Sequence, residues 1–170
     1  IALALAAFAR TRDSLELEDL HMPEVAPPES LAPTPSIPGR TSSLRERLEQ
    51  RRVFGSAEPG TGTHALTGGW MRLAELQVPD APALALFCDS WPPALAQLHV
   101  LGSARVRGVP TIDLTVHFRA ALPANARAED FYLCVFRTRT VRNGFLEEDG
   151  ELWTRDGVLL AQSRQLALLV

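Results

Sequence analysis

Apolar and polar residues alternate along most of the second half of the chain, and this period of two is typical of β-strands. The clearest case is PTIDLTVHFR, in which the apolar residues fall on one face and the polar residues on the other. Other segments combine weaker alternation with many β-branched and aromatic residues, which also favour strands. The pattern predicts five strands, at 70–77, 110–119, 131–141, 145–154 and 158–170.

Glycine-containing dipeptides mark the boundaries of the later strands. Asn143-Gly144 is the strongest short signal for a tight hairpin, because both residue types tolerate positive φ. Asp156-Gly157 predicts a second turn, before the last strand. Asp149-Gly150 lies inside a predicted strand instead, where it indicates a β-bulge.

Between Asp80 and Leu98 the apolar residues recur every three or four positions, which predicts a helix. Asp80 is a suitable N-cap, and Pro82 falls in the first turn, where its missing N–H costs nothing. The helix is apolar on almost all sides, so we expect the rest of the domain to enclose it. Pro92-Pro93 must kink or break it at Ser90–Trp91.

One buried helix between a first strand and four later antiparallel strands predicts an α+β protein with the hotdog fold, a long antiparallel sheet wrapped around a single central helix. A lone hotdog leaves an edge strand unpaired, and exposed edges invite association. Two hotdogs side by side form one continuous sheet. We therefore expect half of a double hotdog, completed by a preceding half of the same chain or by another subunit of a homo-oligomer.

The first quarter of the chain differs in composition from the rest. Residues 20–43 are rich in proline, which removes backbone donors and fixes φ, so this stretch predicts an extended linker. The apolar segment before it, within 1–19, is interpreted as the last strand of a preceding hotdog, and 44–170 as the C-terminal hotdog domain. Within that domain, 44–54 is compatible with a helix or an edge strand, and the glycine-rich stretch 55–69 predicts a loop.

Composition narrows the possible classes of function. The 170 residues carry a net charge of −3, which argues against nucleic-acid binding, and no apolar run is long enough to cross a membrane. All 17 basic residues are arginines, which excludes chemistry that needs a lysine, such as a Schiff base or a Walker A motif. Cys88 and Cys134 lie in apolar runs, so we expect buried thiols in a reducing, cytoplasmic setting.

Asp89 is the most informative polar residue, because it lies in the apolar helix beside the proline pair. An unpaired carboxylate is costly to bury, and a broken helix leaves backbone groups without helical partners, so a site can form there. The alternative is that Asp89 caps a helix that restarts at Pro92. Thr111, at the start of a strand, and Gln165, in the last strand, also interrupt apolar surroundings, although a polar residue of this kind taken alone is more often structural.

The common catalytic signatures GxSxG, HExxH and GxGxxG are absent from the sequence. The four histidines show no metal-ligand spacing, so the sequence predicts neither a metal site nor a cofactor. His117 lies on the polar face of its strand and is the histidine best placed to contact a ligand.

From Gly69 to Val170 the chain resembles the C-terminal hotdog of the acyl-CoA thioesterase II (TesB-like) family and its thioesterase-like relatives. The resemblance rests on the order and spacing of GGWMRLAE, LALFCDSWPPAL, PTIDLTVHFR and GFLEEDGELWTRDGVLLAQSRQLAL. Members of this family consist of two fused hotdogs joined by a variable linker. The resemblance implies that an aspartate of the central helix, a threonine opening the next strand and a glutamine of the last strand hold a water molecule. These positions correspond to Asp89, Thr111 and Gln165.

The resemblance implies an acyl-CoA thioesterase of fatty acid metabolism, which hydrolyses an acyl-CoA to free acid and CoA without a metal or cofactor. Asp89 would accept a proton from the water that Thr111 and Gln165 position. Backbone N–H groups near the helix break or the helix start would stabilise the oxyanion. The alternatives are a non-catalytic acyl-binding or structural hotdog module and, because no histidine neighbours Asp89, less readily a hotdog dehydratase.

Overall fold

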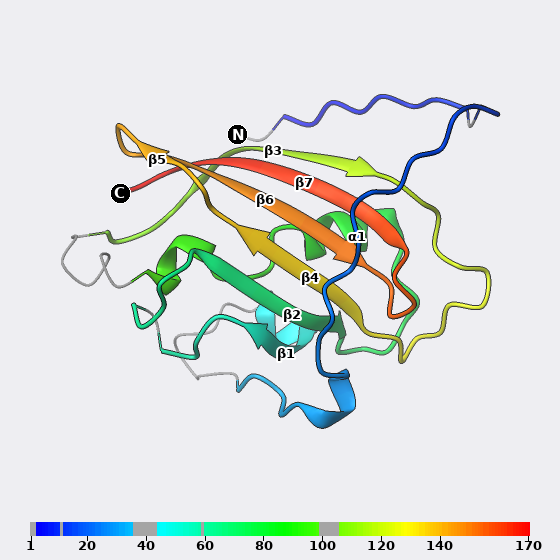
Figure 1. The fold of residues 1–170 in the computed structure, drawn as a ribbon, viewed down its shortest axis with the longest axis horizontal. Coiled ribbons are helices and arrows are strands. Elements are labelled where there is room, and N and C mark those ends of the chain that lie inside the picture. Colours follow the sequence, from blue (N-terminus) through cyan, green and yellow to red (C-terminus); the bar gives the residue numbers. More distant parts are fainter. Residues whose placement is uncertain (1–2, 11, 36–43, 59, 99–105) are drawn as a thin grey trace.

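The computed structural model describes the chain except residues 1–2, 11, 36–43, 59 and 99–105, so the last part of the predicted linker lies outside the described residues. Seven antiparallel strands form one curved sheet in the order β1-β2-β4-β6-β7-β3, and the short β5 pairs with β6 (Figure 1). The strands are β1 (Leu48–Phe54), β2 (Leu66–Leu73), β3 (Thr111–Phe118), β4 (Tyr132–Arg137), β5 (Val141–Arg142), β6 (Phe145–Trp153) and β7 (Leu159–Leu168). The 3-10 turns are η1 (Pro28–Ser30), η2 (Arg45–Arg47) and η3 (Ala94–Gln97), and the one α-helix among the described residues is α1 (Ala81–Phe87).

The predicted strands are present, with shifted boundaries. The segment 110–119 becomes β3, and 131–141 divides into β4 and β5. The strand predicted at 70–77 begins at Leu66 and ends at Leu73, so the predicted loop is shorter than 55–69. For 44–54 the edge-strand alternative is confirmed, because β1 lies at one end of the sheet after a single 3-10 turn.

Two of the three predicted turns and irregularities are confirmed, and one is wrong. Asn143 and Gly144 have φ of 54° and 79° and form the hairpin between β5 and β6, and Gly157 has φ of 85° in the next turn. Asp149 and Gly150 do not form a bulge, since both keep regular pairing with β4 and β7. A glycine is needed at 150 for a different reason: a Cβ there would collide with Ser163 Oγ and the ring of Phe136.

The predicted helix over 80–98 is two separate pieces. α1 ends at Phe87, with Cys88 as its C-cap, and η3 resumes at Ala94 after an irregular stretch. The break expected from Pro92-Pro93 is confirmed, and it begins earlier than Ser90–Trp91. Proline cannot donate the i→i−4 hydrogen bond and disfavours helical φ/ψ in the residue before it. The helical hydrogen bonds therefore cannot continue past the end of α1.

The predicted N-cap of α1 is confirmed. The Ala83 N–H donates to Asp80 Oδ1 at 2.9 Å, which satisfies one of the free donors of the first turn. We expect Asp80→Ala to lower the free energy of unfolding by about 1 kcal/mol, measured by urea denaturation. Asp80→Asn, which can still accept this hydrogen bond, is the control. Equal stability of the alanine variant and the wild type would contradict the capping role.

Both faces of the sheet are covered over its middle strands, whereas β3 at one edge is largely exposed. The inner face packs on α1 through a cluster that includes Met71, Phe87 and Leu152. The outer face packs around Trp70, Leu133 and Trp153. Cys88 and Cys134 are buried free thiols, as the sequence predicted. Within the described part of the chain, no helix is both long and apolar enough to cross a membrane.

The proline-rich segment lies across the outer face, where it runs in front of the sheet towards β1 (Figure 1). Met22, Val25 and Leu31 pack against the outer cluster. The Trp70 Nε1–H donates to the Ala26 carbonyl at 2.8 Å, and the Arg51 guanidinium donates to the Pro28 carbonyl at 2.7 Å. The part of the predicted linker that the structure describes is therefore docked on the domain.

Candidate active site

The structure brings together the three residues predicted to form a site. Asp89 follows the end of α1, Thr111 is the first residue of β3, and Gln165 lies on β7, the strand paired with β3. Gln165 Nε2 donates to Asp89 Oδ1 at 3.1 Å and also to Thr111 Oγ1. One amide group thus links a carboxylate and a hydroxyl that are distant in the sequence.

The helix break that carries Asp89 is held by hydrogen bonds on both sides. Ser90 Oγ donates to the Leu86 carbonyl of the last turn of α1 at 2.5 Å. The Ser90 carbonyl accepts from Gln50 Nε2 of β1 at 2.9 Å, and Gln50 is buried. Sequence analysis missed Gln50, because it lies in a segment so rich in charged residues that one further polar side chain gives no signal.

Asp89 remains accessible and yet is partly desolvated. Burial raises the pKa of this carboxyl above its usual range, and the hydrogen bond from Gln165 partly opposes that increase. The carboxylate opens into a hollow of about 200 Å³ lined by Leu44, Arg45, Asp89, Ser90, Trp91 and Pro92. A raised pKa makes the ionised form a stronger base.

The three side chains offer the groups that a reacting water molecule requires. The two Nε2 hydrogens of Gln165 already go to Asp89 and Thr111, so towards a water molecule the Asp89 carboxylate and the Gln165 amide oxygen accept hydrogen bonds and the Thr111 hydroxyl donates one. Such a set can fix a water molecule and remove one of its protons. Among the described residues, no group of three or more His, Cys, Asp or Glu side chains is arranged to hold a metal ion.

A buried carboxylate that sequence analysis missed lies next to this set. Glu148 of β6 is 7% exposed and pairs directly with Gln165 of β7, so the two side chains share the inner face. Its Oε2 accepts from the Ala94 N–H at 2.5 Å and from Thr138 Oγ1 at 3.4 Å. The alternation in FLEEDGELW could have indicated that Glu148 is buried, because it falls on the same face of the strand as Leu146 and Leu152.

The ionisation of Glu148 should make stability depend on pH. Burial, aided by the charge on Asp89, raises the pKa of Glu148 from 4.5 to about 7. Between these values the folded protein holds a proton that the unfolded chain has lost, so the free energy of unfolding falls as the pH rises. The contribution amounts to about 3 kcal/mol across the window.

Glu148→Gln has no charge to titrate, so its stability relative to the wild type should increase by that amount from pH 4.5 to above pH 7. Urea denaturation of both proteins at several pH values measures this difference. A difference that stays constant with pH would show that Glu148 has an ordinary pKa.

Three backbone donors near the helix start and the helix break, where an oxyanion site was predicted, already have hydrogen-bond partners. At the helix start the Ala83 N–H donates to Asp80, and after the break the Ala94 N–H donates to Glu148. The Asp89 N–H donates to the Leu86 carbonyl at 3.1 Å. These three groups would have to exchange partners before they could stabilise a negatively charged intermediate.

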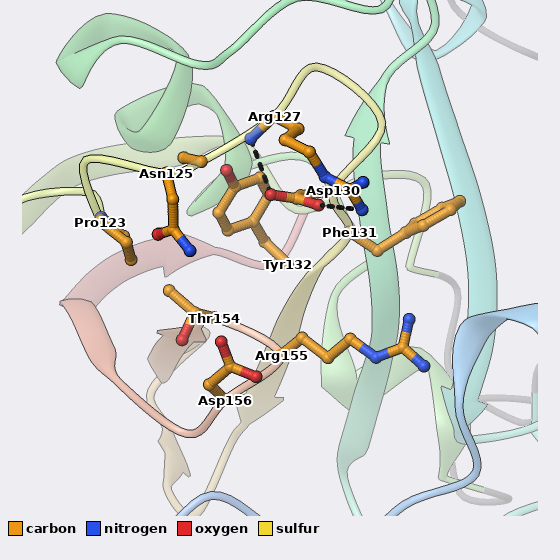
Figure 2. Close-up of a pocket in the computed structure, with 10 residues that line it drawn as sticks. Pro123, Asn125, Arg127, Asp130, Phe131, Tyr132, Thr154, Arg155 and Asp156 are labelled. Atoms are coloured by element: carbon orange, nitrogen blue, oxygen red, sulfur yellow. Dashed lines mark hydrogen bonds and ion pairs between the residues drawn. The ribbon is translucent and has the colours of Figure 1, made fainter.

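A larger hollow, of about 470 Å³, lies between the loop at 123–131 and the turn at 154–156 and does not include the three site residues (Figure 2). Three of its four charged side chains form ion pairs, Arg127 with Asp130 and Arg155 with Glu29, and the fourth is Asp156. The hollow contains none of the three residues that the helix break, β3 and β7 bring together. Size therefore does not identify the reactive site in this chain.

The family model for the acyl-CoA thioesterase C-terminal domain matches residues 28–169, most of the chain. The chain belongs to the acyl-CoA thioesterase C-terminal domain family. The family match covers β1 to β7 and therefore all three site residues. No curated protein sequence shows significant similarity to this family member.

Solved structures confirm the hotdog fold of this thioesterase-family domain. A conserved protein of unknown function with a hotdog fold from Alicyclobacillus acidocaldarius is 26% identical, with a TM-score of 0.77 over 94% of this chain and 58% of its own. The acyl-CoA thioesterase II TesB2 from Mycobacterium marinum is 23% identical, with a TM-score of 0.58 over 94% of this chain and 59% of its own. The chain thus spans less than two thirds of the length of these relatives.

Proposed function

We propose that the chain takes part in the hydrolysis of an acyl-CoA thioester to the free acid and CoA. The observation that carries the proposal is the Gln165 amide, which links the Asp89 carboxylate and the Thr111 hydroxyl at the helix break. Membership of the acyl-CoA thioesterase family supports the same reaction.

In the proposed reaction Asp89 is the general base. The oxygen of a water molecule held by Thr111 and Gln165 forms a bond to the thioester carbonyl carbon while one proton passes to the Asp89 carboxylate. The carbonyl then re-forms, the carbon–sulfur bond breaks, and the CoA thiolate takes the proton from Asp89. Atoms and charge balance without a metal or cofactor, because the carboxylate is regenerated in each turnover.

We further propose that a second hotdog completes the protein, either as a preceding half of the chain or as another subunit. β3 is an edge strand with one neighbour, and its Ile112 and Phe118 are 53% and 50% exposed. Leu5 and Phe8 of the predicted preceding strand are 100% and 94% exposed. Unpaired edges and exposed apolar side chains of this kind are typical of surfaces that another sheet covers.

A second candidate function is that of a non-catalytic acyl-binding or structural hotdog module. The observation that favours it is the engagement of the N–H groups of Ala83, Asp89 and Ala94 by other partners, which leaves these three without a free hydrogen for an oxyanion.

Incubation with acyl-CoAs of graded chain length and a thiol reagent tests the two functions. Release of free CoA, in proportion to protein concentration, supports the hydrolase. Tight acyl-CoA binding without thiol release, measured by calorimetry, supports the binding module and contradicts hydrolysis.

A further inference from the structure

Glu148 is a buried acid that the proposed reaction does not use. Glu148 lies on β6 and is the register partner of Gln165 on β7. Asp89 lies at the helix break and accepts a hydrogen bond from the same Gln165. The Glu148 carboxylate also accepts a hydrogen bond from the N–H of Ala94, the first residue of η3 after the proline pair. Glu148 therefore contacts the break itself and the strand that holds the water-binding amide.

Resting on the proposed function, we propose that Glu148 is a positioning residue of the Asp89–Thr111–Gln165 site, whose ionised form fixes the helix break and increases the basicity of Asp89. The hydrogen bond from Ala94 provides the first effect, because an ionised carboxylate is a stronger acceptor than a protonated one. Gln165 is the register partner of Glu148 and donates to Asp89, and the repulsion between the two carboxylates provides the second effect.

The charged groups that act on Glu148 are both acidic. Asp89 faces it from the end of α1, and Glu147 precedes it on β6. The other groups around it are neutral: Thr138 after β4, Gln165 of β7 and the Ala94 N–H of η3. Among the described residues, no arginine or histidine contributes to the shift of its pKa. Within the part of the chain that the structure describes, no basic partner of Glu148 therefore cancels the electrostatic effect of its carboxylate on Asp89.

Electrostatic coupling between two sites is reciprocal. The charge on Asp89 raises the proton affinity of Glu148, so the charge on Glu148 must raise the proton affinity of Asp89 by the same free energy. A base with higher proton affinity removes the proton of water more effectively. Ionisation of Glu148 near neutral pH should therefore increase the rate of the chemical step.

Two measurements test this inference. The first is a ¹³C NMR titration of the Glu148 carboxyl, assigned by its loss in Glu148→Gln, in the wild type, in Asp89→Asn and in the control Asp156→Asn. The second is the pH profile of kcat for acyl-CoA hydrolysis. For the second, Glu151→Gln is the matched control for Glu148→Gln, because Glu151 lies on the same strand, faces the opposite side and accepts from Trp153 Nε1, a contact that glutamine can also make.

We expect the Glu148 titration midpoint to move to lower pH in Asp89→Asn, because the charge of Asp89 contributes to its raised pKa, and to stay unchanged in Asp156→Asn. We expect kcat of Glu148→Gln to lose its rise near neutral pH and to fall roughly threefold to tenfold at alkaline pH. Glu148→Asp, which keeps the charge, should retain part of that rise.

An unchanged Glu148 midpoint in folded Asp89→Asn overturns the inference, as does a Glu148→Gln kcat profile identical to that of the wild type. If the wild type hydrolyses no acyl-CoA at any pH, the proposed function fails, and the NMR titration still decides whether Glu148 is coupled to Asp89. A wild-type Glu148 carboxyl that titrates at its ordinary pKa also overturns the inference, and that measurement needs no variant.

Discussion

Asp89→Asn is expected to reduce kcat for acyl-CoA hydrolysis by about 10²–10⁴-fold, the usual contribution of a general base. Asparagine matches aspartate in shape, and its amide oxygen can still accept from Gln165 Nε2, so the contacts at the helix break should persist. The loss should therefore appear in kcat with little change in KM or in the free energy of unfolding. Steady-state kinetics with a thiol reagent and urea denaturation measure these quantities.

Two comparisons make this prediction specific. Asp156→Asn makes the same chemical change in the turn before β7, away from the three site residues, and should leave kcat unchanged. Thr111→Val and Gln165→Ala remove groups that position water without removing the base, so each should cost less than Asp89→Asn. The alternative role of Asp89 as a helix cap is wrong, because η3 begins at Ala94 with Pro93 as its N-cap and no side-chain cap. Wild-type kcat in Asp89→Asn would therefore show that another group activates the water.

The order of elements could be predicted because each signal is local. The alternation of β3 and the Asn143-Gly144 hairpin are fixed by residues that adjoin in the sequence. The end of α1 was placed too late, because apolar spacing continues through Trp91 although the prolines remove the backbone hydrogen bonds. Periodicity records which residues are buried, and it does not record whether the backbone between them is helical.

The candidate site shows the same division between local and long-range signals. Asp89 could be found because a carboxylate beside two prolines is unusual within a few residues of sequence. Gln50 and Glu148 act on the site through pairing partners and neighbours from other elements, so their roles depend on sheet order. In an isolated sequence Glu148 is one of several acids in FLEEDGELW, and only the β6–β7 register distinguishes it.

The stability of the fold is expected to be most sensitive at the glycine pair that begins GGWMRLAE. Gly68 and Gly69 have φ of 139° and 154°, which residues with a Cβ rarely adopt. A Cβ at Gly68 would collide with the carbonyl oxygen of Cys134 on β4, and one at Gly69 with that of Arg51 on β1. Both obstacles are backbone atoms, so a side-chain rotation cannot relieve them.

Gly68→Ala should therefore lower the free energy of unfolding by about 3–5 kcal/mol, the combined cost of backbone strain and overpacking. Gly144→Ala is the matched control, because Gly144 also has positive φ, at 79°, but a Cβ there would meet no atom within 4 Å. That control should cost only about 1–2 kcal/mol. Urea denaturation compares the two, and a Gly68→Ala variant as stable as Gly144→Ala would contradict the close approach of β2 and β4.

The same geometry connects this glycine pair with the candidate site. Gly69 allows β1 to lie close against β2, and β1 carries Gln50, whose side chain holds the Ser90 carbonyl next to Asp89. A Cβ at Gly69 would push β1 away and draw Gln50 from the helix break. Gly69→Ala should therefore lower kcat as well as stability, whereas the edge hairpin variant Gly144→Ala should lower stability alone. Equal kcat values in the two folded variants would show that the break holds Asp89 without help from β1.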